Sequence, residues 1–298
     1  MDTLEIEAFL SVVRYGSFTE GAKALFLSQS TLSHRILELE AKVGMNLIDR
    51  GRGLKNLALT ENGKEFLVIA RRWENLIHDT QRLRSRTKKL SLSIGATDTI
   101  HNFILPPLYQ AMHDAAQHMS IRMKTHNSTE LYFQVDQGEL DVAFAFLDMP
   151  MKNILVERFY KEPRVLIRRE PYSSEKCNTC IEQDCLDSDK EVYFEGETAF
   201  QTWYDFWKGD RGYPSVSVDT AQLLLQLLRQ EGAWSIVPLS MAKRLTEKKN
   251  FCYYRLMDPP PERICYKIRS KYPKSSTVAS LEILDRCLSS FYIESIFN

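Results

Sequence analysis

The chain has 298 residues, of which 44% are hydrophobic and 26% are charged, and its formal net charge is zero. This composition is ordinary for a folded globular protein and excludes wholesale disorder, and the length favours about two domains. No stretch approaches the roughly 20 consecutive apolar residues that cross a bilayer, so a membrane partner is not expected. The first residues contain neither a basic segment nor an apolar signal core, which predicts a cytoplasmic protein.

Charge is divided unevenly along the chain. Residues 1–90 hold 15 Lys and Arg against 11 Asp and Glu, whereas the remainder holds 24 against 28. A basic N-terminal segment followed by an acidic remainder is typical of a protein whose N-terminal module binds a polyanion. The split is a weak signal by itself, because scattered surface charge also produces it.

Three helices are predicted near the N-terminus. Apolar residues recur every three or four positions over 4–13, and Gly16 ends this first helix in a left-handed cap. The motif Ser-Phe-Thr-Glu at 17–20 fits a capping box that begins a short second helix. Ser28 is the N-cap of a third helix over 29–40. Two short helices joined by the tight turn before Ser28 predict a helix-turn-helix.

The polar face of the third helix is suited to the major groove of DNA. Gln pairs with adenine, Arg with guanine or phosphate, and Ser with several base edges. The candidate residues are Gln29, Ser30, Thr31, Ser33, His34 and Arg35. For any single one of them a solvated helix face is the favoured explanation, but the turn before the helix and the basic hairpin after it favour DNA contact for the set. A glycine-punctuated loop before a strand at 57–59 forms a predicted wing, whose cations contact phosphate or the minor groove: Arg50, Arg52 and Lys55.

An ordered set of residues spans this region with fixed gaps. It reads Ala22-x-x-Leu25-x-x-Ser28-Gln29-Ser30-x-Leu32-Ser33-x-x-Ile36-x-x-Leu39-Glu40-x-x-x-Gly44-x-x-Leu47-x-x-Arg50, then Leu59-Thr60-x-x-Gly63. This set resembles the motif of the LysR-type transcriptional regulators. Ile48 and Asp49 stand where the family usually has Phe and Glu, and both changes are conservative. The resemblance implies that the polar face of the third helix contacts DNA and that Arg50 holds the wing to the backbone.

A long helix is predicted after Thr60, which is a good N-cap. Its apolar positions recur every three or four residues, as in a coiled-coil seam interrupted by Thr80: Phe66, Ile69, Trp73, Leu76 and Leu83. The alternative is a helix that packs on its own domain. Dimerisation is favoured, because a lone helix-turn-helix contacts only a few base pairs. The resemblance implies homodimers formed through this helix, and homotetramers.

From Leu90 onward strands and helices alternate, with one helix expected from about 103 to 116, which predicts an α/β module with a doubly wound sheet. The resemblance implies a two-lobed, periplasmic-binding-protein-like effector domain, with the run 138–143 its most recognisable part. We therefore expect a winged helix-turn-helix over 1–60, a linker helix over 61–89 and an effector-binding domain over 90–298. Within that domain lobe I is expected over 90–162 and 268–298, and lobe II over 163–267.

Polar residues follow several predicted strands, at helix N-termini whose free N–H groups attract anions. They are Thr97, Asp98, Thr99, Asn127, Ser128, Thr129, Glu195, Asp219 and Thr220. Each is also an ordinary N-cap candidate. The resemblance implies that they line a cleft for a small-molecule effector of unknown identity, and Asp98 argues against a purely anionic one. Three aromatic residues in lobe II fit either a pocket or the core: Trp203, Tyr204 and Trp207.

Six cysteines occur, three of them in one polar loop: Cys177, Cys180 and Cys185. Two thiolates two residues apart and a third five residues on suit zinc or another soft metal, although no fourth ligand is evident. The alternatives are a thiol-based switch and a loop with no regulatory role. Cysteines 252, 265 and 287 lie among apolar neighbours and are predicted to be packing residues. No other cofactor is expected.

No sequence motif of an enzyme is evident: neither a glycine-rich phosphate loop, nor Gly-x-Ser-x-Gly, nor His-Glu-x-x-His. The predicted function is a sequence-specific DNA-binding transcription regulator that senses a small molecule between two lobes. Its expected partners are double-stranded DNA, further copies of itself, the effector and, as a candidate, RNA polymerase. The alternative is a metal- or redox-responsive regulator that acts through the three-cysteine loop.

Overall fold

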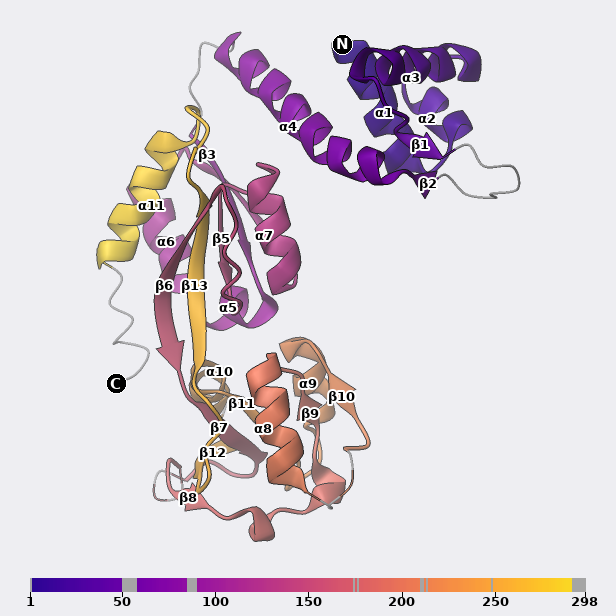
Figure 1. Cartoon of the computed structure of the whole chain (residues 1–298). Coiled ribbons are helices and arrows are strands. Elements are labelled where there is room, and N and C mark those ends of the chain that lie inside the picture. The colour runs from indigo at the N-terminus through magenta and orange to yellow at the C-terminus, as the bar shows by residue number, and fades with distance from the viewer. Residues whose placement is uncertain are drawn as a thin grey trace. The chain divides into compact units, whose positions relative to one another are not determined.

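A computed structural model of the chain describes residues 2–49, 58–84, 90–173, 175, 177–209, 212, 214–247 and 249–290 (Figure 1). The chain forms two units, Met1–Lys88 with Gln137–Glu139 and the remainder from Lys89 onward, and each is described by itself. Among the described helices, none combines the length and the apolar composition that a bilayer span requires.

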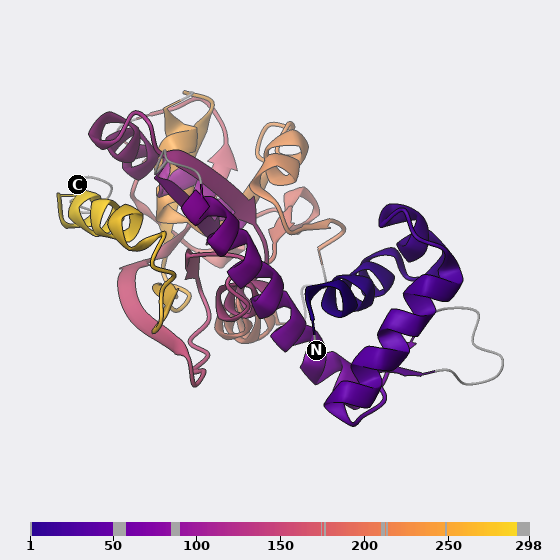
Figure 2. The ribbon, with the colours of Figure 1, turned by 90° about the horizontal axis from the view of Figure 1, so that it is seen from above.

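The first unit is built on a head of three helices. Its elements are α1 (Thr3–Tyr15), α2 (Phe18–Ala24), α3 (Gln29–Val43), β1 (Ile48–Asp49), β2 (Ala58–Leu59) and α4 (Glu61–Arg84). Apolar residues of α1, α3 and the start of α4 form one buried core, in which Phe9 meets Phe66 edge-on. Figures 1 and 2 show α4 as a single unbroken helix that continues beyond this head.

Local capping interactions set the helix ends. The Ser28 Oγ accepts a hydrogen bond from the Thr31 amide (3.1 Å) at the start of α3, and Gly16 ends α1 at a φ of 67°. The capping box predicted at 17–20 forms only in part. The Ser17 Oγ accepts from the Glu20 amide (3.0 Å), but the Glu20 carboxylate accepts from the Lys23 ammonium (2.8 Å) instead of the Ser17 backbone.

Lobe I of the second unit is a mixed sheet of order β4-β3-β5-β13-β6, in which β13 is antiparallel to both of its neighbours, β5 and β6. Helices α6 and α11 cover one face of the sheet and α7 covers the other (Figure 1). The elements are β3 (Ser91–Ala96), α5 (Asp98–Phe103), α6 (Pro106–Ala115), β4 (Ser120–Thr125), α7 (Ser128–Asp136), β5 (Val142–Ala145), β6 (Ile154–Glu162), β13 (Arg263–Ser270) and α11 (Val278–Ser290).

Lobe II has a sheet of order β11-β7-β12-β8 and a parallel pair, β10-β9. Its elements are β7 (Arg164–Arg169), β8 (Cys180–Ile181), the 3₁₀ helices η1 (Gln183–Cys185) and η2 (Ser188–Lys190), β9 (Tyr193–Phe194), α8 (Thr198–Lys208), β10 (Ser217–Val218), α9 (Ala221–Leu227), β11 (Trp234–Pro238), α10 (Leu239–Thr246) and β12 (Phe251–Leu256). The aromatic residues of α8 pack with β11 and β12, which favours the core interpretation over a pocket: Trp203, Tyr204 and Trp207.

Two predictions of the sequence were wrong in detail. The helix expected over 103–116 is divided, because α5 ends at Phe103 and Pro106 begins α6, where its missing N–H costs nothing. The return to lobe I was placed at 268. In the structure β13 lies in the lobe I sheet from Arg263 onward, where it is opposite Glu162. Residues 263–267 therefore belong to lobe I.

Candidate DNA-binding face and interlobe site

Helix α3 separates its polar and apolar residues cleanly. Its apolar residues Leu32, Ile36 and Leu39 are fully buried in the head. The predicted DNA-contacting residues lie on the other side: Gln29, Ser30, Thr31 and His34 are exposed, and Ser33 and Arg35 are half-buried. The helix therefore presents a hydrogen-bonding face while its opposite face anchors it.

Hydroxyl groups order the first turn of α3. The Ser28 Oγ lies 2.8 Å from the Ser30 Oγ and 2.7 Å from the Thr31 Oγ1. The Thr19 hydroxyl of α2 donates to the Gln29 Oε1 (3.2 Å). These contacts fix side chains of the first turn before any partner arrives, which lowers the entropy cost of binding.

The base of the wing is well defined. Ile48 of β1 pairs with Leu59 of β2, and the Thr60 amide donates to the Leu47 carbonyl (3.1 Å). The predicted wing contacts lie outside the described residues: Arg50, Arg52 and Lys55.

Sequence reasoning passed over Phe26, which lies in the turn before α3. It has a φ of 56° and its side chain is 97% exposed. A non-glycine residue rarely adopts this left-handed conformation, and Asn tolerates it better than Phe.

Replacing Phe26 with Asn is therefore expected to raise the stability of the head by about 1 kcal/mol, since strain falls and no burial is lost. Thermal unfolding of the full chain measures it. Phe206→Asn is the control, because Phe206 is 86% exposed but lies within helix α8. Equal effects of both changes would contradict the role of the φ angle.

The two lobes are joined by a carboxylate. The Asp98 Oδ2 at the start of α5 accepts a hydrogen bond from the Ala221 amide at the start of α9 (2.9 Å), while the Asn102 amide donates to the other oxygen (2.7 Å). Asp98 belongs to lobe I and Ala221 to lobe II. The structure thus brings the predicted groups 97–99 and 219–220 together.

The other predicted effector residues follow strands that end at the same edges. Strands β3 and β4 are parallel neighbours, so 127–129 share an edge with 97–99, and β9 and β10 place Glu195 beside 219–220. Several already have local partners. The Asn127 Oδ1 caps α7 by accepting from the Glu130 amide (2.9 Å), and the Ser128 Oγ accepts from the Phe146 amide (3.2 Å).

Buried ionic groups mark the two crossings between the lobes, and sequence reasoning missed them. Glu162 is fully buried and accepts from the Arg263 Nε (2.8 Å) and from the Ser240 amide (2.9 Å). The Arg263 Nη1 donates to the Thr99 hydroxyl (3.0 Å). Beside them Arg164 pairs with Glu197 at 2.6 Å. Three charged residues next to the predicted crossings were the only available signal in the sequence: Glu162, Arg164 and Arg263.

Burial and neighbouring charge act on these groups in opposite directions. Burial alone disfavours both guanidinium ions, and it lowers the pKa of Arg164. Burial is also the largest single influence on Arg263, but the pKa of Arg263 is nevertheless raised, because Glu162, Tyr160 and Glu197 together outweigh burial. Each guanidinium also stacks on an aromatic ring, Arg164 on Phe200 (4.1 Å) and Arg263 on Phe146 (4.0 Å). The crossings are therefore held by paired charges.

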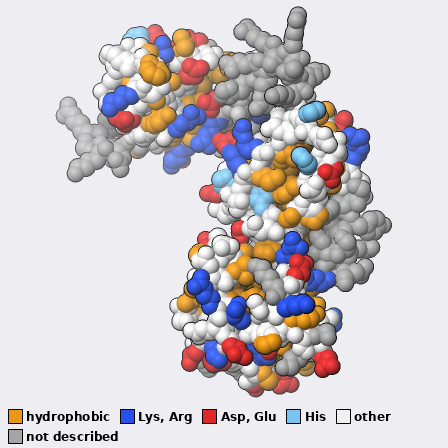
Figure 3. All heavy atoms as spheres, turned by 180° about the vertical axis from the view of Figure 1, so that it is seen from behind, with side chains coloured by type: hydrophobic (Ala, Val, Ile, Leu, Met, Phe, Trp, Pro, Cys, Tyr) orange, Lys and Arg blue, Asp and Glu red, His pale blue; other side chains and the backbone are white. Residues whose placement is uncertain are grey.

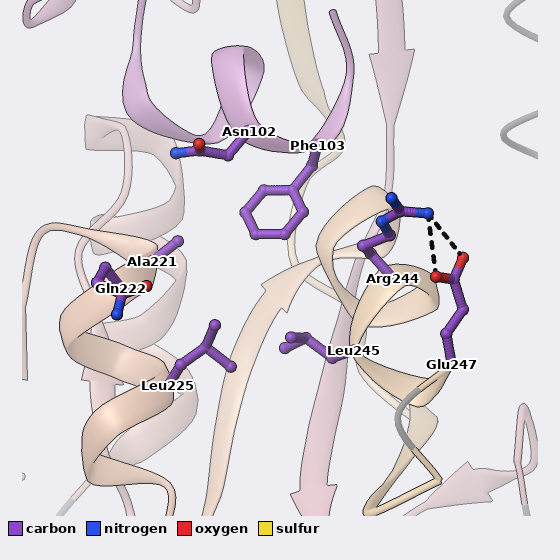
Figure 4. A pocket seen from close by; sticks show the side chains of 8 residues that line it. All are labelled: Asn102, Phe103, Ala221, Gln222, Leu225, Arg244, Leu245 and Glu247. Carbon is purple, nitrogen blue, oxygen red and sulfur yellow. Dashed lines mark hydrogen bonds and ion pairs between the residues drawn. The ribbon is translucent and has the colours of Figure 1, made fainter. Parts of the chain in front are cut away.

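A cavity of about 590 Å³ lies between the lobes, next to the Asp98–Ala221 hydrogen bond. Figure 4 shows the Phe103 ring pointing into the space between α9 and α10, with the Arg244–Glu247 ion pair (3.0 Å) at one side. The lining residues are Asn102, Phe103, Ala221, Gln222, Leu225, Arg244, Leu245 and Glu247. None of the nine predicted effector residues lines it. Its volume is suited to a small molecule.

The three-cysteine loop does not gather its sulfur atoms. Cys177 is half-buried, whereas Cys180 and Cys185 are exposed on β8 and η1. Within the described residues, no group of three or more His, Cys, Asp or Glu side chains is arranged to hold a metal ion. The predicted zinc or soft-metal site at Cys177, Cys180 and Cys185 therefore gains no geometric support.

Both units match known families. Residues 4–64 match the family described as "Bacterial regulatory helix-turn-helix protein, lysR family", and residues 85–282 match "LysR substrate binding domain". The chain belongs to the LysR family of transcriptional regulators. The LysR-type fold predicted from the sequence is confirmed: an N-terminal helix-turn-helix and a C-terminal α/β effector domain.

Individual LysR-type relatives are more distant. A "Probable RuBisCO transcriptional regulator" of Cyanidioschyzon merolae is 30% identical over 142 residues, and the match spans about half of each chain, 47% of this one and 46% of that one. The regulator CitR of Bacillus subtilis is 26% identical over 84% of this chain and 87% of its own. These relatives are transcriptional regulators and not enzymes.

The fold of the whole LysR-type chain is found in solved structures. Full-length CbnR complexed with its target DNA superposes with a TM-score of 0.65, covering 96% of this chain and 100% of that one at 22% identity. At this identity the likeness concerns the fold.

On the face shown in Figure 3, Lys and Arg side chains are interspersed with Asp and Glu over lobe II at the bottom of the view.

Proposed function

We propose that the chain is a sequence-specific DNA-binding regulator that reads a major groove with α3. The observation that carries the proposal is the division of α3 into a fully buried apolar face and an exposed face of amide, hydroxyl, imidazole and guanidinium groups. Such a face offers both the donors and the acceptors that distinguish base pairs. Matching relatives carry names of transcriptional regulators, which is consistent with this role.

Selection of duplexes from a randomised library by the full chain tests the proposal. We expect a two-half-site motif, and an affinity for it that falls with salt as counterions are released. Arg35→Ala is expected to weaken binding by about 1–3 kcal/mol. Lys161→Ala in the effector domain removes an equal charge and serves as the control. Failure to enrich any motif, or affinity independent of salt, would contradict DNA recognition.

We infer that α4 carries the dimer contact. The predicted apolar stripe divides into two sets. Phe66 and Trp73 pack on the head, whereas Ile69 and Leu76 are 53% and 61% exposed and lie seven residues apart. Residues that are seven positions apart lie on the same side of a helix, as a coiled-coil seam requires. Phe66 and Trp73 thus fit a helix that packs on its own domain, whereas the exposure of Ile69 and Leu76 supports the proposed dimer contact. Homotetramers would need a second interface.

Leu76→Asp is expected to raise the dissociation constant of the dimer by at least about tenfold, because association would bury an unpaired charge. Light scattering over a dilution series measures the change. The control is Leu147→Asp, which introduces the same charge at an exposed residue outside α4. An unchanged dissociation constant for the Leu76 variant would place the dimer interface elsewhere.

The effector is proposed to bind where the lobes meet. The strand ends of both lobes converge there, the Asp98–Ala221 hydrogen bond spans the two lobes, and the 590 Å³ cavity lies beside it. A small molecule that binds one lobe arrangement better than the other shifts the population toward it. The hydroxyl and amide groups after β3 and β4 are proposed to contact it: Thr97, Thr99, Asn127, Ser128 and Thr129.

A further inference from the structure

Two cysteines that are distant in sequence face each other in lobe II. Strand β8 runs parallel to β12, with Ile181 opposite Leu256. The pairing continues toward the start of both segments, since the Asn178 amide donates to the Tyr253 carbonyl (2.8 Å). The same register places Cys177 beside Cys252.

Side-chain contacts confirm this placement. Cys252 belongs to the buried apolar cluster under α8, and Cys177 packs against that cluster. Burial is the main reason why the pKa of the Cys252 thiol is raised, and the neighbouring Cys177 side chain raises it further. Ser173 contacts both cysteines, because its amide donates to the Cys252 Sγ (3.3 Å) while its carbonyl accepts from the Cys177 amide (2.9 Å).

The neighbouring cysteines are oriented differently. Cys180 is exposed, although the adjacent Ile181 is buried in the cluster, so its side chain leaves the opposite face of β8. Asn178 adopts a φ of 69°, and this left-handed residue turns the chain between the two cysteines of the Cys-x-x-Cys sequence. Cys265 and Cys287 lie in the core of lobe I.

The paired thiols differ in access. Cys177 is partly exposed, whereas Cys252 is fully buried. Burial raises the pKa of the Cys252 thiol to about 11, so it is protonated at neutral pH. A reagent in solution therefore reaches Cys177 first, and the buried Cys252 Sγ is placed to attack the Cys177 Sγ once that atom is part of a mixed disulfide.

We propose that Cys177 and Cys252 are a site of reversible thiol oxidation, at which exchange with a low-molecular-weight disulfide forms an intramolecular disulfide. The Cys177 thiolate attacks one sulfur of the reagent, forms a mixed disulfide and releases one thiolate. The Cys252 Sγ then attacks the Cys177 Sγ, its proton passes to the released thiolate, and the second thiolate departs. Two protein thiols lose two electrons, and the reagent is reduced to two thiols.

The test exposes the reduced full chain to oxidised glutathione, blocks the remaining thiols and maps unreduced peptides by mass spectrometry. We expect a peptide pair joined through Cys177 and Cys252, its disappearance after dithiothreitol, and the loss of two of the six free thiols. A principal cross-link between Cys177 and Cys180, or no cross-link at all, overturns the proposal.

Substitutions separate the role of Cys177, which attacks the reagent, from that of Cys252, which resolves the mixed disulfide. Cys252→Ala is expected to stop at a glutathione adduct on Cys177, because the resolving thiol is missing. Cys177→Ser is expected to give neither the cross-link nor an adduct on Cys252. The double variant Cys180→Ser, Cys185→Ser is the matched control and is expected to retain the cross-link at the unaltered rate. Since Cys252 is the buried member of the pair and Cys177 is partly exposed, Cys177→Ser keeps the test decisive if Cys252→Ala fails to fold.

Discussion

Replacing Glu162 with Ala is expected to lower the free energy of unfolding of the effector domain by about 3–5 kcal/mol. The side chain is fully buried and accepts hydrogen bonds from the Arg263 Nε and the Ser240 amide. Its removal leaves a guanidinium charge and a backbone donor in the interior without this acceptor. Breaking one side of a buried pair is costly for that reason.

Urea unfolding of the full chain, followed by the fluorescence of the lobe II tryptophans, measures this loss. The control is Lys161→Ala, which removes the exposed partner of Glu262 (2.7 Å) one residue earlier in β6. An exposed pair of this kind contributes about 0–1 kcal/mol. Similar losses in both variants would show that the buried charges do not hold the crossings.

The second large effect is expected in the DNA-binding unit. Replacing Glu40 with Ala should destabilise this unit by about 2–4 kcal/mol, because hydrogen bonds to a buried carboxylate are strong and its donors lose them. The Glu40 Oε1 accepts from the Leu47 amide (2.8 Å) and from the Ile48 amide (3.1 Å), and the residue is 6% exposed. These bonds fix the turn between α3 and the wing.

Glu38→Ala on the same helix is the control, since Glu38 is exposed and contacts only the exposed His34 in the described structure. Melting of the full chain monitored by circular dichroism, together with affinity for a selected duplex, measures both variants. Because the turn carries the wing, the Glu40 variant should lose stability and DNA affinity together. Lost affinity at unchanged stability would instead indicate direct contact of Glu40 with DNA.

Features encoded over short stretches were predicted well from the sequence. Ser28 and Gly16 act as the predicted caps, because capping depends on one residue and its immediate neighbours. The exposed face of α3 also follows from helical period alone. The prediction of one continuous helix from 103 was wrong. The apolar period continues through Pro106, but a proline in the middle of a helix interrupts the backbone hydrogen bonds, so a new helix begins there.

Long-range pairings could not be predicted in this way. Glu162 and Arg263 are about a hundred residues apart, and neither has a local pattern that marks it as buried. Cys252 was correctly predicted to be a packing residue, but its neighbour Cys177 was assigned to a metal loop. Both pairings depend on strand register across the fold, which a single sequence does not reveal.

The carboxylate that joins the lobes has a consequence for the dose response of the regulator. An effector that parts the lobes must first break the Asp98–Ala221 hydrogen bond, so its apparent affinity equals its intrinsic affinity multiplied by the fraction of molecules already open. A bond of about 1 kcal/mol would lower the sensitivity about fivefold. Through this hydrogen bond, the residue at position 98 would raise the concentration at which such an effector acts, in addition to any direct contact with the signal molecule.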